Sequence, residues 1–192
     1  VDVCLGKGAG VEVGAVSEAE GTVVLCGFME HIGQAGVHSG ASACSLPTQT
    51  IRDASLATIR EWTPKVARRL GVIGLINIQY AVIPDGTVYI IEANPRASRT
   101  VPFVAKAIGH PLAKYASLVM AGATFKDDNF TEEPKLNHVA VKEAVLPFDK
   151  FAGADTLLGR EMRSTGEVMG IDKDFTKAYA KAQLAAGQRL PA

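Results

Sequence analysis

Residues 74–94, Gly-Leu-Ile-Asn-Ile-Gln-Tyr-Ala-Val-Ile-Pro-Asp-Gly-Thr-Val-Tyr-Ile-Ile-Glu-Ala-Asn, decide the fold of this chain. The stretch contains two runs rich in β-branched and aromatic residues, 74–83 and 87–93, and such runs are typical of β-strands. Between them stands Asp85-Gly86, the pair preferred at the centre of a two-residue type I′ turn. The stretch therefore predicts an antiparallel β-hairpin.

A two-residue turn also fixes which residues of the hairpin lie opposite each other. The predicted partners are Ile83 with Val88, Ala81 with Ile90, and Gln79 with Glu92. Side chains alternate along a strand, so Asn94 is expected on the same face as Gln79 and Glu92. The opposite face is expected to belong to the core and carries Ile78, Tyr80, Val82, Tyr89 and Ile91.

The polar face of the hairpin has the composition of a magnesium site. The carboxylate of Glu92 and the amide oxygens of Gln79 and Asn94 are ligands that Mg²⁺ accepts when it keeps some waters and bridges nucleotide phosphates. Arg96 and Arg99 follow, and guanidinium groups suit phosphate oxygens. The same residues would also fit an exposed cross-strand pair followed by two surface arginines. From spacing alone both interpretations stay open.

The segments outside the hairpin predict a mixture of strands and helices. Strands are expected at 11–16, 22–28 and 138–146, and helices at 51–70, 101–108, 111–121 and 175–186. Pro64 is expected to kink or split the first helix, and Thr100 is expected to be the N-cap of the second. Loops are expected at 33–45 and between the last strand and the last helix. The polar connector 126–137 divides the chain into a body, residues 1–124, and a tail, residues 125–192.

The composition excludes several classes of function. The 192 residues contain 47% hydrophobic and 21% charged residues, enough to bury a sizeable core. The 20 Lys and Arg balance the 20 Asp and Glu, so nucleic acid is not an expected partner. No apolar run approaches the roughly 20 residues that span a bilayer, so no membrane is expected either. Cys4, Cys26 and Cys44 have no metal-binding spacing and are expected to be free buried thiols.

Several motifs resemble a known family, the large subunit of carbamoyl phosphate synthetase, in its second ATP-grasp half. The resemblance covers about residues 11 to 192, and the runs 46–50 and 108–115 resemble plant and algal members. The motifs are Met29-Glu30-His31, Ala35-Gly36-Val37-His38-Ser39-Gly40, Ile91-Glu92-Ala93-Asn94-Pro95-Arg96-Ala97-Ser98-Arg99-Thr100-Val101-Pro102-Phe103, Val141-Lys142-Glu143-Ala144-Val145, and the run from Glu161 to Met169.

The resemblance implies a fold, an activity and partners. The fold is α/β (α+β), the C-terminal subdomain of an ATP-grasp unit, with an antiparallel sheet flanked by helices and a mixed tail leading toward a regulatory domain. The activity is phosphorylation of carbamate by Mg·ATP, which makes carbamoyl phosphate for pyrimidines and arginine. Ammonia comes from a glutaminase small subunit or a fused glutaminase domain. The compartment would be the cytoplasm, or the plastid stroma in a plant or alga.

The resemblance also implies roles for residues of this chain. Arg96 and Arg99 match catalytic phosphate-side arginines. The metal ligands, for Mg²⁺ or Mn²⁺, are Gln79, Glu92 and Asn94; the nucleotide contacts are Gly36, Val37, His38, Ser39, Gln79 and Glu92; and a potassium site would use His31, Gln34, Val37 and Ser42. The Lys142-Glu143 pair is expected to be an exposed ion pair without a catalytic role, and Arg163 is expected to be structural.

Departures from the family leave alternatives open. The family carries acids where this chain has Gly10, Gly14, Gly33 and Ala41, which puts the potassium site and ribose contacts in doubt. One rival is another ATP-grasp ligase, such as a biotin carboxylase or a purine-pathway ligase. Another is a degenerate scaffold that binds no metal. ATP-grasp units hold ATP between two subdomains, so the isolated chain is expected to bind nucleotide weakly and to be inactive.

Overall fold

The computed structural model describes residues 8–33, 37, 39–150, 153, 155–159 and 161–189. Seven strands form one antiparallel sheet in the order β5-β4-β1-β2-β3-β6-β7. The strands are β1 (Ala9–Ser17), β2 (Val23–Ile32), β3 (Ala43–Leu46), β4 (Gly74–Val82), β5 (Val88–Asn94), β6 (Val139–Val145) and β7 (Gly166–Asp172). The helices are α1 (Asp53–Arg69), α2 (Val101–Ile108), α3 (Leu112–Met120) and α4 (Phe175–Ala185), with short 3-10 turns η1 (Ser39–Ala41) and η2 (Phe148–Lys150).

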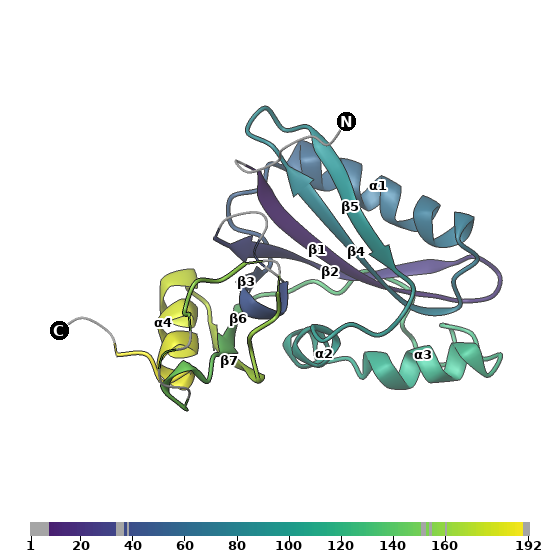
Figure 1. Ribbon diagram of the computed structural model, residues 1–192. Helices are drawn as coiled ribbons and strands as arrows, with labels where there is room; N and C mark the ends of the chain where they lie inside the picture. Colours follow the sequence, from purple (N-terminus) through teal and green to yellow (C-terminus); the bar gives the residue numbers. More distant parts are fainter. Residues whose placement is uncertain are drawn as a thin grey trace.

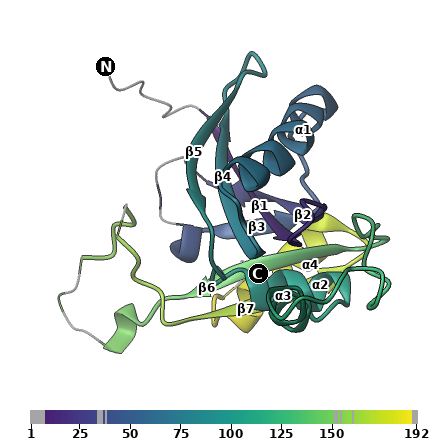
Figure 2. The ribbon, with the colours of Figure 1, turned by 90° about the vertical axis from the view of Figure 1, so that its right-hand side faces the viewer.

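The sheet separates two hydrophobic cores (Figures 1 and 2). Figure 1 shows α1 on one side of β1, β4 and β5, and α2 and α3 on the other. The α1 side contains Val13, Ile78 and Tyr80. The α2 and α3 side contains Val16 and Phe103. Alternation along β1 thus feeds both cores, as expected for a sheet covered on two faces.

The β4–β5 hairpin is present, but its turn is longer than the sequence predicts. The Ile83 amide donates to the Thr87 carbonyl (3.0 Å) and the Gly86 amide to the Ile83 carbonyl (2.9 Å), which closes a three-residue loop. Pro84 accounts for the difference. In a two-residue loop it would face Thr87 without an N–H to donate, whereas its fixed φ suits the first central position of the turn that begins at Ile83. Gly86 then takes the left-handed conformation, with φ +98°.

A β-bulge between Gln79 and Tyr80 corrects the register before it reaches the polar face. Near the turn Ala81 pairs with Tyr89, so the predicted pairing of Ala81 with Ile90 and of Ile83 with Val88 is wrong. Past the bulge Gln79 pairs with Glu92, as predicted. Ile91, expected in the core, lies on this edge strand with 53% of its surface exposed, and Tyr89 is half-buried.

Other elements confirm or correct the sequence predictions. The remaining predicted strands and the helices are present within a few residues of their expected bounds. Pro64 does not split α1, because the carbonyl it deprives of a partner belongs to Arg60 on the exposed side of the helix. Thr100 stands at the N-cap of α2, but its side chain makes no capping bond.

Strand β7 was not predicted. Gly166 and Gly170 made its segment look like a loop, but Gly170 serves close packing: an added Cβ would stand 2.0 Å from the Ala178 carbonyl oxygen of α4. Strand β3 likewise lies in a segment expected to be a loop. Both sides of the expected boundary at residue 124 therefore contribute strands to one sheet.

Among the described residues no helix combines the length and apolar character needed to cross a membrane.

Two of the three cysteines are buried free thiols, as expected, and Cys4 lies outside the described residues. Burial raises the pKa of the Cys26 thiol to about 12. Because the thiolate is the reactive form, iodoacetamide at pH 8 is expected to leave Cys26 unmodified in the folded protein and to modify it after denaturation. Peptide mass spectrometry measures this. Equal modification rates before and after denaturation would contradict the burial described here.

Candidate functional site

A pocket of about 170 Å³ lies at the end of the β4–β5 hairpin. Its walls come from distant parts of the sequence: strands β1, β4 and β5, the segment that links β5 to α2, and two residues near η1 and β7. The lining residues are Glu12, Gly40, Asn77, Gln79, Glu92, Asn94, Arg96, Ser98, Arg99, Thr100 and Met162. All five residues singled out on and after the hairpin, Gln79, Glu92, Asn94, Arg96 and Arg99, are therefore brought to one pocket.

The predicted metal ligands share one end of the hairpin. Gln79 and Glu92 are direct partners across the strands. The Asn94 Nδ2 amide donates to Glu92 Oε1 (2.9 Å), which leaves the Asn94 amide oxygen for another partner. Glu92 is exposed and Asn94 half-buried. The exposed carboxylate and the amide oxygens form a hard-oxygen donor set, so the residues fit a magnesium or manganese ion.

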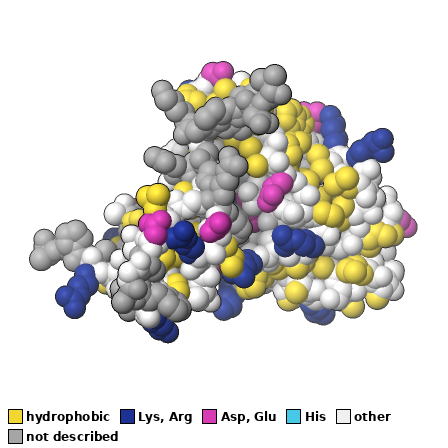
Figure 3. Space-filling model, in the orientation of Figure 1, with side chains coloured by type: hydrophobic (Ala, Val, Ile, Leu, Met, Phe, Trp, Pro, Cys, Tyr) yellow, Lys and Arg dark blue, Asp and Glu magenta, His cyan; other side chains and the backbone are white. Residues whose placement is uncertain are grey.

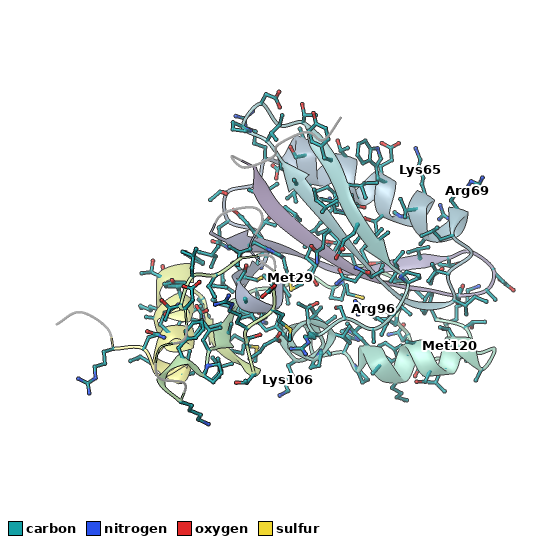
Figure 4. The ribbon with its side chains drawn as sticks, viewed as in Figure 1. Met29, Lys65, Arg69, Arg96, Lys106 and Met120 are labelled. Carbon is teal, nitrogen blue, oxygen red and sulfur yellow. The ribbon has the colours of Figure 1, made fainter. Side chains whose placement is uncertain are left out.

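The two arginines lie on the loop between β5 and α2. The Arg96 amide donates to the Asn94 carbonyl (2.8 Å), and this tight turn places both arginines against the pocket. Figure 4 shows Arg96 where β5 ends, above α2. Both side chains are exposed, and acidic and basic side chains meet near the middle of the face shown in Figure 3. The pocket can therefore hold an anion beside a cation.

The pocket also contains a buried polar cluster that the sequence analysis missed. Glu12 is 1% exposed, and its Oε1 accepts from Asn77 Nδ2 (2.6 Å) and from the Thr100 hydroxyl (2.5 Å). Ser98 Oγ lies 2.6 Å from Thr100 Oγ1. Within the described residues the Asn77 Oδ1 atom has no hydrogen-bond partner. The available signal was Glu12 and Asn77 themselves, two polar residues inside otherwise apolar strands.

His31 forms an ion pair with Glu12. Its Nε2 lies 3.4 Å from Glu12 Oε2, and the ring occupies space that a Cβ on Gly10 would crowd at 3.2 Å. Burial opposes a charged imidazole, but the sulfur of Cys44 and the carboxylate of Glu12 outweigh it and raise the pKa of His31 to about 10. Burial would also raise the pKa of Glu12, yet the nearby His31 and the hydrogen bond from Thr100 lower it. Both groups are therefore charged at neutral pH.

Half of the predicted 36–39 nucleotide loop lies outside the described residues. Gln34, Gly36 and His38 lie outside the described residues, and of Ser39 only the backbone, in η1, is described. Val37 forms an isolated bridge, and Ser42 is buried. The potassium assignment of His31, Gln34, Val37 and Ser42 and the nucleotide contacts of this loop stay predictions.

The tail contributes to the pocket through the segment before β7. Met162 lines the pocket together with Gly40, and the Ser164 hydroxyl donates to the Gly40 carbonyl (2.7 Å). Arg163 donates to the Asp155 carbonyl, consistent with the structural role expected of it.

Lys142 and Glu143 do not form the exposed ion pair that the sequence predicted. The Lys142 side chain is fully buried, and its Nζ lies 3.8 Å from Glu167 on the neighbouring strand. The Lys142 side chain is buried because its position on β6 faces the protein interior. Its partners on the neighbouring strands are Cys44 and Met169. Glu143 points the other way, is half-buried and accepts from the Ala144 amide and from Gln183 of α4.

Residues 1–127 match the family model of the carbamoyl-phosphate synthase L chain, ATP binding domain. The chain belongs to this family. A carbamoyl phosphate synthase arginine-specific large chain, chloroplastic, from Oryza sativa subsp. japonica is 64% identical over 94% of this chain and 15% of its own length. A carbamoyl phosphate synthase large chain from a Nostoc species is 60% identical over 100% of this chain and 18% of its own. The chain thus spans less than a fifth of the carbamoyl phosphate synthases it matches.

Solved structures with the same fold are ATP-grasp proteins of the biotin carboxylase type. A complete multifunctional pyruvate carboxylase from Rhizobium etli superposes with a TM-score of 0.71 and 17% identity, over 95% of this chain and 21% of the other. The biotin carboxylase domain of a Hydrogenobacter thermophilus 2-oxoglutarate carboxylase, solved with MgADP and bicarbonate, has a TM-score of 0.60 and 14% identity, over 75% and 31%. These likenesses show the shared ATP-grasp fold, while the sequence relatives identify the carbamoyl phosphate synthase family.

Proposed function

We propose that this chain supplies one wall of an ATP site that phosphorylates carbamate to carbamoyl phosphate within a longer carbamoyl phosphate synthase large chain. The observation that carries the proposal is the single pocket that gathers Gln79, Glu92, Asn94, Arg96 and Arg99. Membership of the carbamoyl phosphate synthase family supports the choice of reaction over that of other ATP-grasp ligases.

The residues divide into two groups by what they can bind. Glu92, Gln79 and Asn94 would hold Mg²⁺ or Mn²⁺, and a bound divalent ion would neutralise charge on the nucleotide phosphates. Arg96 and Arg99 have exposed guanidinium groups at the same pocket, so they can hold a phosphoryl oxygen or the carbamate carboxylate. The arginines thereby orient the acceptor oxygen toward the phosphoryl group, which is the main contribution a protein makes to this transfer.

Further parts of the proposal rest on the family alone. Gly36, Val37, His38 and Ser39 would contact nucleotide. Gln34, Val37 and Ser42, with the backbone carbonyl of His31 and not its charged ring, would surround a potassium ion. The longer chain would receive ammonia from a glutaminase subunit or domain. Its product would serve arginine and pyrimidine synthesis, in the plastid stroma if the source is a plant or alga and otherwise in the cytoplasm.

The test is the reverse partial reaction in the longer chain, ATP formation from carbamoyl phosphate and Mg·ADP. Activity is expected with Mg²⁺ or Mn²⁺, is expected to vanish on addition of EDTA, and is expected to return with excess metal, because the phosphates need a divalent partner. A coupled hexokinase assay measures the ATP. A longer chain that forms no ATP under these conditions would refute the proposed function and favour a scaffold without activity.

A further inference from the structure

The hydrogen bonds around Glu12 run in one direction. Glu12 Oε1 accepts from Asn77 Nδ2 and from the Thr100 hydroxyl, so the Asn77 amide presents its nitrogen to Glu12. The alternative amide orientation would bring two oxygens to 2.6 Å. The single hydroxyl proton of Thr100 is likewise committed to Glu12. The Ser98 hydroxyl, 2.6 Å from Thr100, must therefore donate to Thr100.

This direction leaves hydrogen-bond acceptors on the pocket residues. Asn77 Oδ1 has no partner among the described residues although Asn77 is only 4% exposed, and Ser98 Oγ keeps its lone pairs. A buried acceptor without a partner costs about 1–3 kcal/mol, so a donor that reaches it is favoured. Ser98 and Asn77 both line the pocket. We call this pair, Asn77 and Ser98, the acceptor corner.

Glu12 Oε1 already accepts from Asn77 and Thr100, and Glu12 Oε2 lies 3.4 Å from His31 Nε2. The acceptor corner adjoins the proposed metal and phosphate groups, since Asn77 pairs with Asn94 across β4 and β5. Arg96 and Arg99 line the same pocket. One pocket of about 170 Å³ therefore has hydrogen-bond acceptors at the acceptor corner and cationic donors on the two arginines.

We propose that Asn77 and Ser98 accept hydrogen bonds from the amino group of carbamate, and so select carbamate over acids that lack N–H donors. The inference rests on the proposed function and adds the part of the substrate that it left unassigned. Carbamate has two N–H donors at one end and a carboxylate at the other, which matches the acceptor corner and the arginines. In the reverse direction the P–O bond of carbamoyl phosphate breaks, a P–O bond to ADP forms, and carbamate leaves without a proton change.

The test compares two phosphoryl donors with the longer chain, carbamoyl phosphate and acetyl phosphate, which carries a methyl group in place of the amino group. In Asn77→Leu the ratio of kcat/KM for carbamoyl phosphate to that for acetyl phosphate is expected to fall about tenfold or more, because only carbamoyl phosphate loses a hydrogen bond. If acetyl phosphate is too slow a donor, its competitive inhibition constant is compared with the KM for carbamoyl phosphate in place of the kcat/KM ratio. Ser98→Ala is a second variant, with a smaller expected fall, if Asn77→Leu folds poorly.

Two controls separate this idea from its rivals. Ser117→Ala, which removes an exposed hydroxyl on α3, should leave the ratio unchanged. Gln79→Leu, which removes a proposed metal ligand, should lower both donors together. If Asn77→Leu and Ser98→Ala also lower both donors equally, the acceptor corner holds a cation or only supports the fold, and the amino-group assignment is wrong. If the unaltered chain forms no ATP from carbamoyl phosphate, the proposed function fails instead.

Discussion

Replacing Glu92 with alanine in the longer chain is expected to lower ATP formation from carbamoyl phosphate and Mg·ADP by about a hundredfold or more. Glu92 is the one carboxylate among the three proposed metal ligands, it faces Gln79 across the hairpin, and it accepts from Asn94. Its loss would remove the only negative charge of the donor set. Steady-state rates at several Mg²⁺ concentrations would show a lower kcat and a weaker metal dependence.

Two comparisons make the Glu92 result specific. Glu20→Ala removes an exposed carboxylate in the turn between β1 and β2, and should leave the rate within about twofold. Glu92→Gln keeps the size of the side chain and an oxygen ligand, so its loss should be smaller than that of Glu92→Ala. If Glu92→Ala keeps a rate close to that of the unaltered chain, the hairpin does not bind the catalytic metal.

Replacing Glu12 with alanine is expected to destabilise the fold by about 3–5 kcal/mol, because it leaves His31, whose side chain is only 11% exposed, without its counter-ion. Asn77 and Thr100 would also lose the acceptor that they share. Urea unfolding followed by circular dichroism measures the free energy of unfolding. Glu20→Ala again supplies an exposed acid as a control, with an expected change under about 0.5 kcal/mol.

The double variant Glu12→Leu/His31→Leu tests whether the pair is the cause. It removes both charges together, so its loss of unfolding free energy should be smaller than the sum of the losses for Glu12→Leu and His31→Leu alone. An additive double variant would show that the two residues do not interact.

The Glu12–His31 pair should also make stability depend on pH. The pKa of His31 is raised from 6.5 to about 10, so its contribution is complete below pH 6.5 and is lost as the pH rises toward 10. The pKa of Glu12 is lowered from 4.5, so its contribution is complete above pH 4.5 and is lost at lower pH. The stability difference between the unaltered protein and Glu12→Ala should therefore be largest between pH 4.5 and 6.5 and should shrink toward pH 10.

The sequence predicted those parts of the fold that depend on neighbouring residues. The hairpin and α2 follow from turn, capping and alternation patterns within short stretches, and the structure contains both. The Gln79–Glu92 pair was also predictable, although through a turn of the wrong length whose error the bulge offsets. The polar face of the site is thus largely local in origin.

The buried half of the site could not be predicted, because it depends on contacts between distant residues. Glu12 reaches Asn77 across the pairing of β1 with β4, and Thr100 across 88 residues of sequence. Thr100 has the residue type of an N-cap, and the same hydroxyl is used by Glu12 instead. Gly170 likewise looks like a strand breaker until the close packing of α4 shows its use. In each case a tertiary contact decides between two local readings.

The bulge beside Gln79 has a consequence for how the hairpin tolerates change. The three-residue loop adds one residue at the tip, and the bulge takes up one residue on the β5 side, so the ladder returns to register before Gln79 and Glu92. A loop shortened by one residue could therefore pair without the bulge and leave those two side chains opposite each other. A change in the length of the turn therefore alters the pairing only between the turn and the bulge. The strand pairing beyond the bulge, which includes Gln79 and Glu92, stays the same.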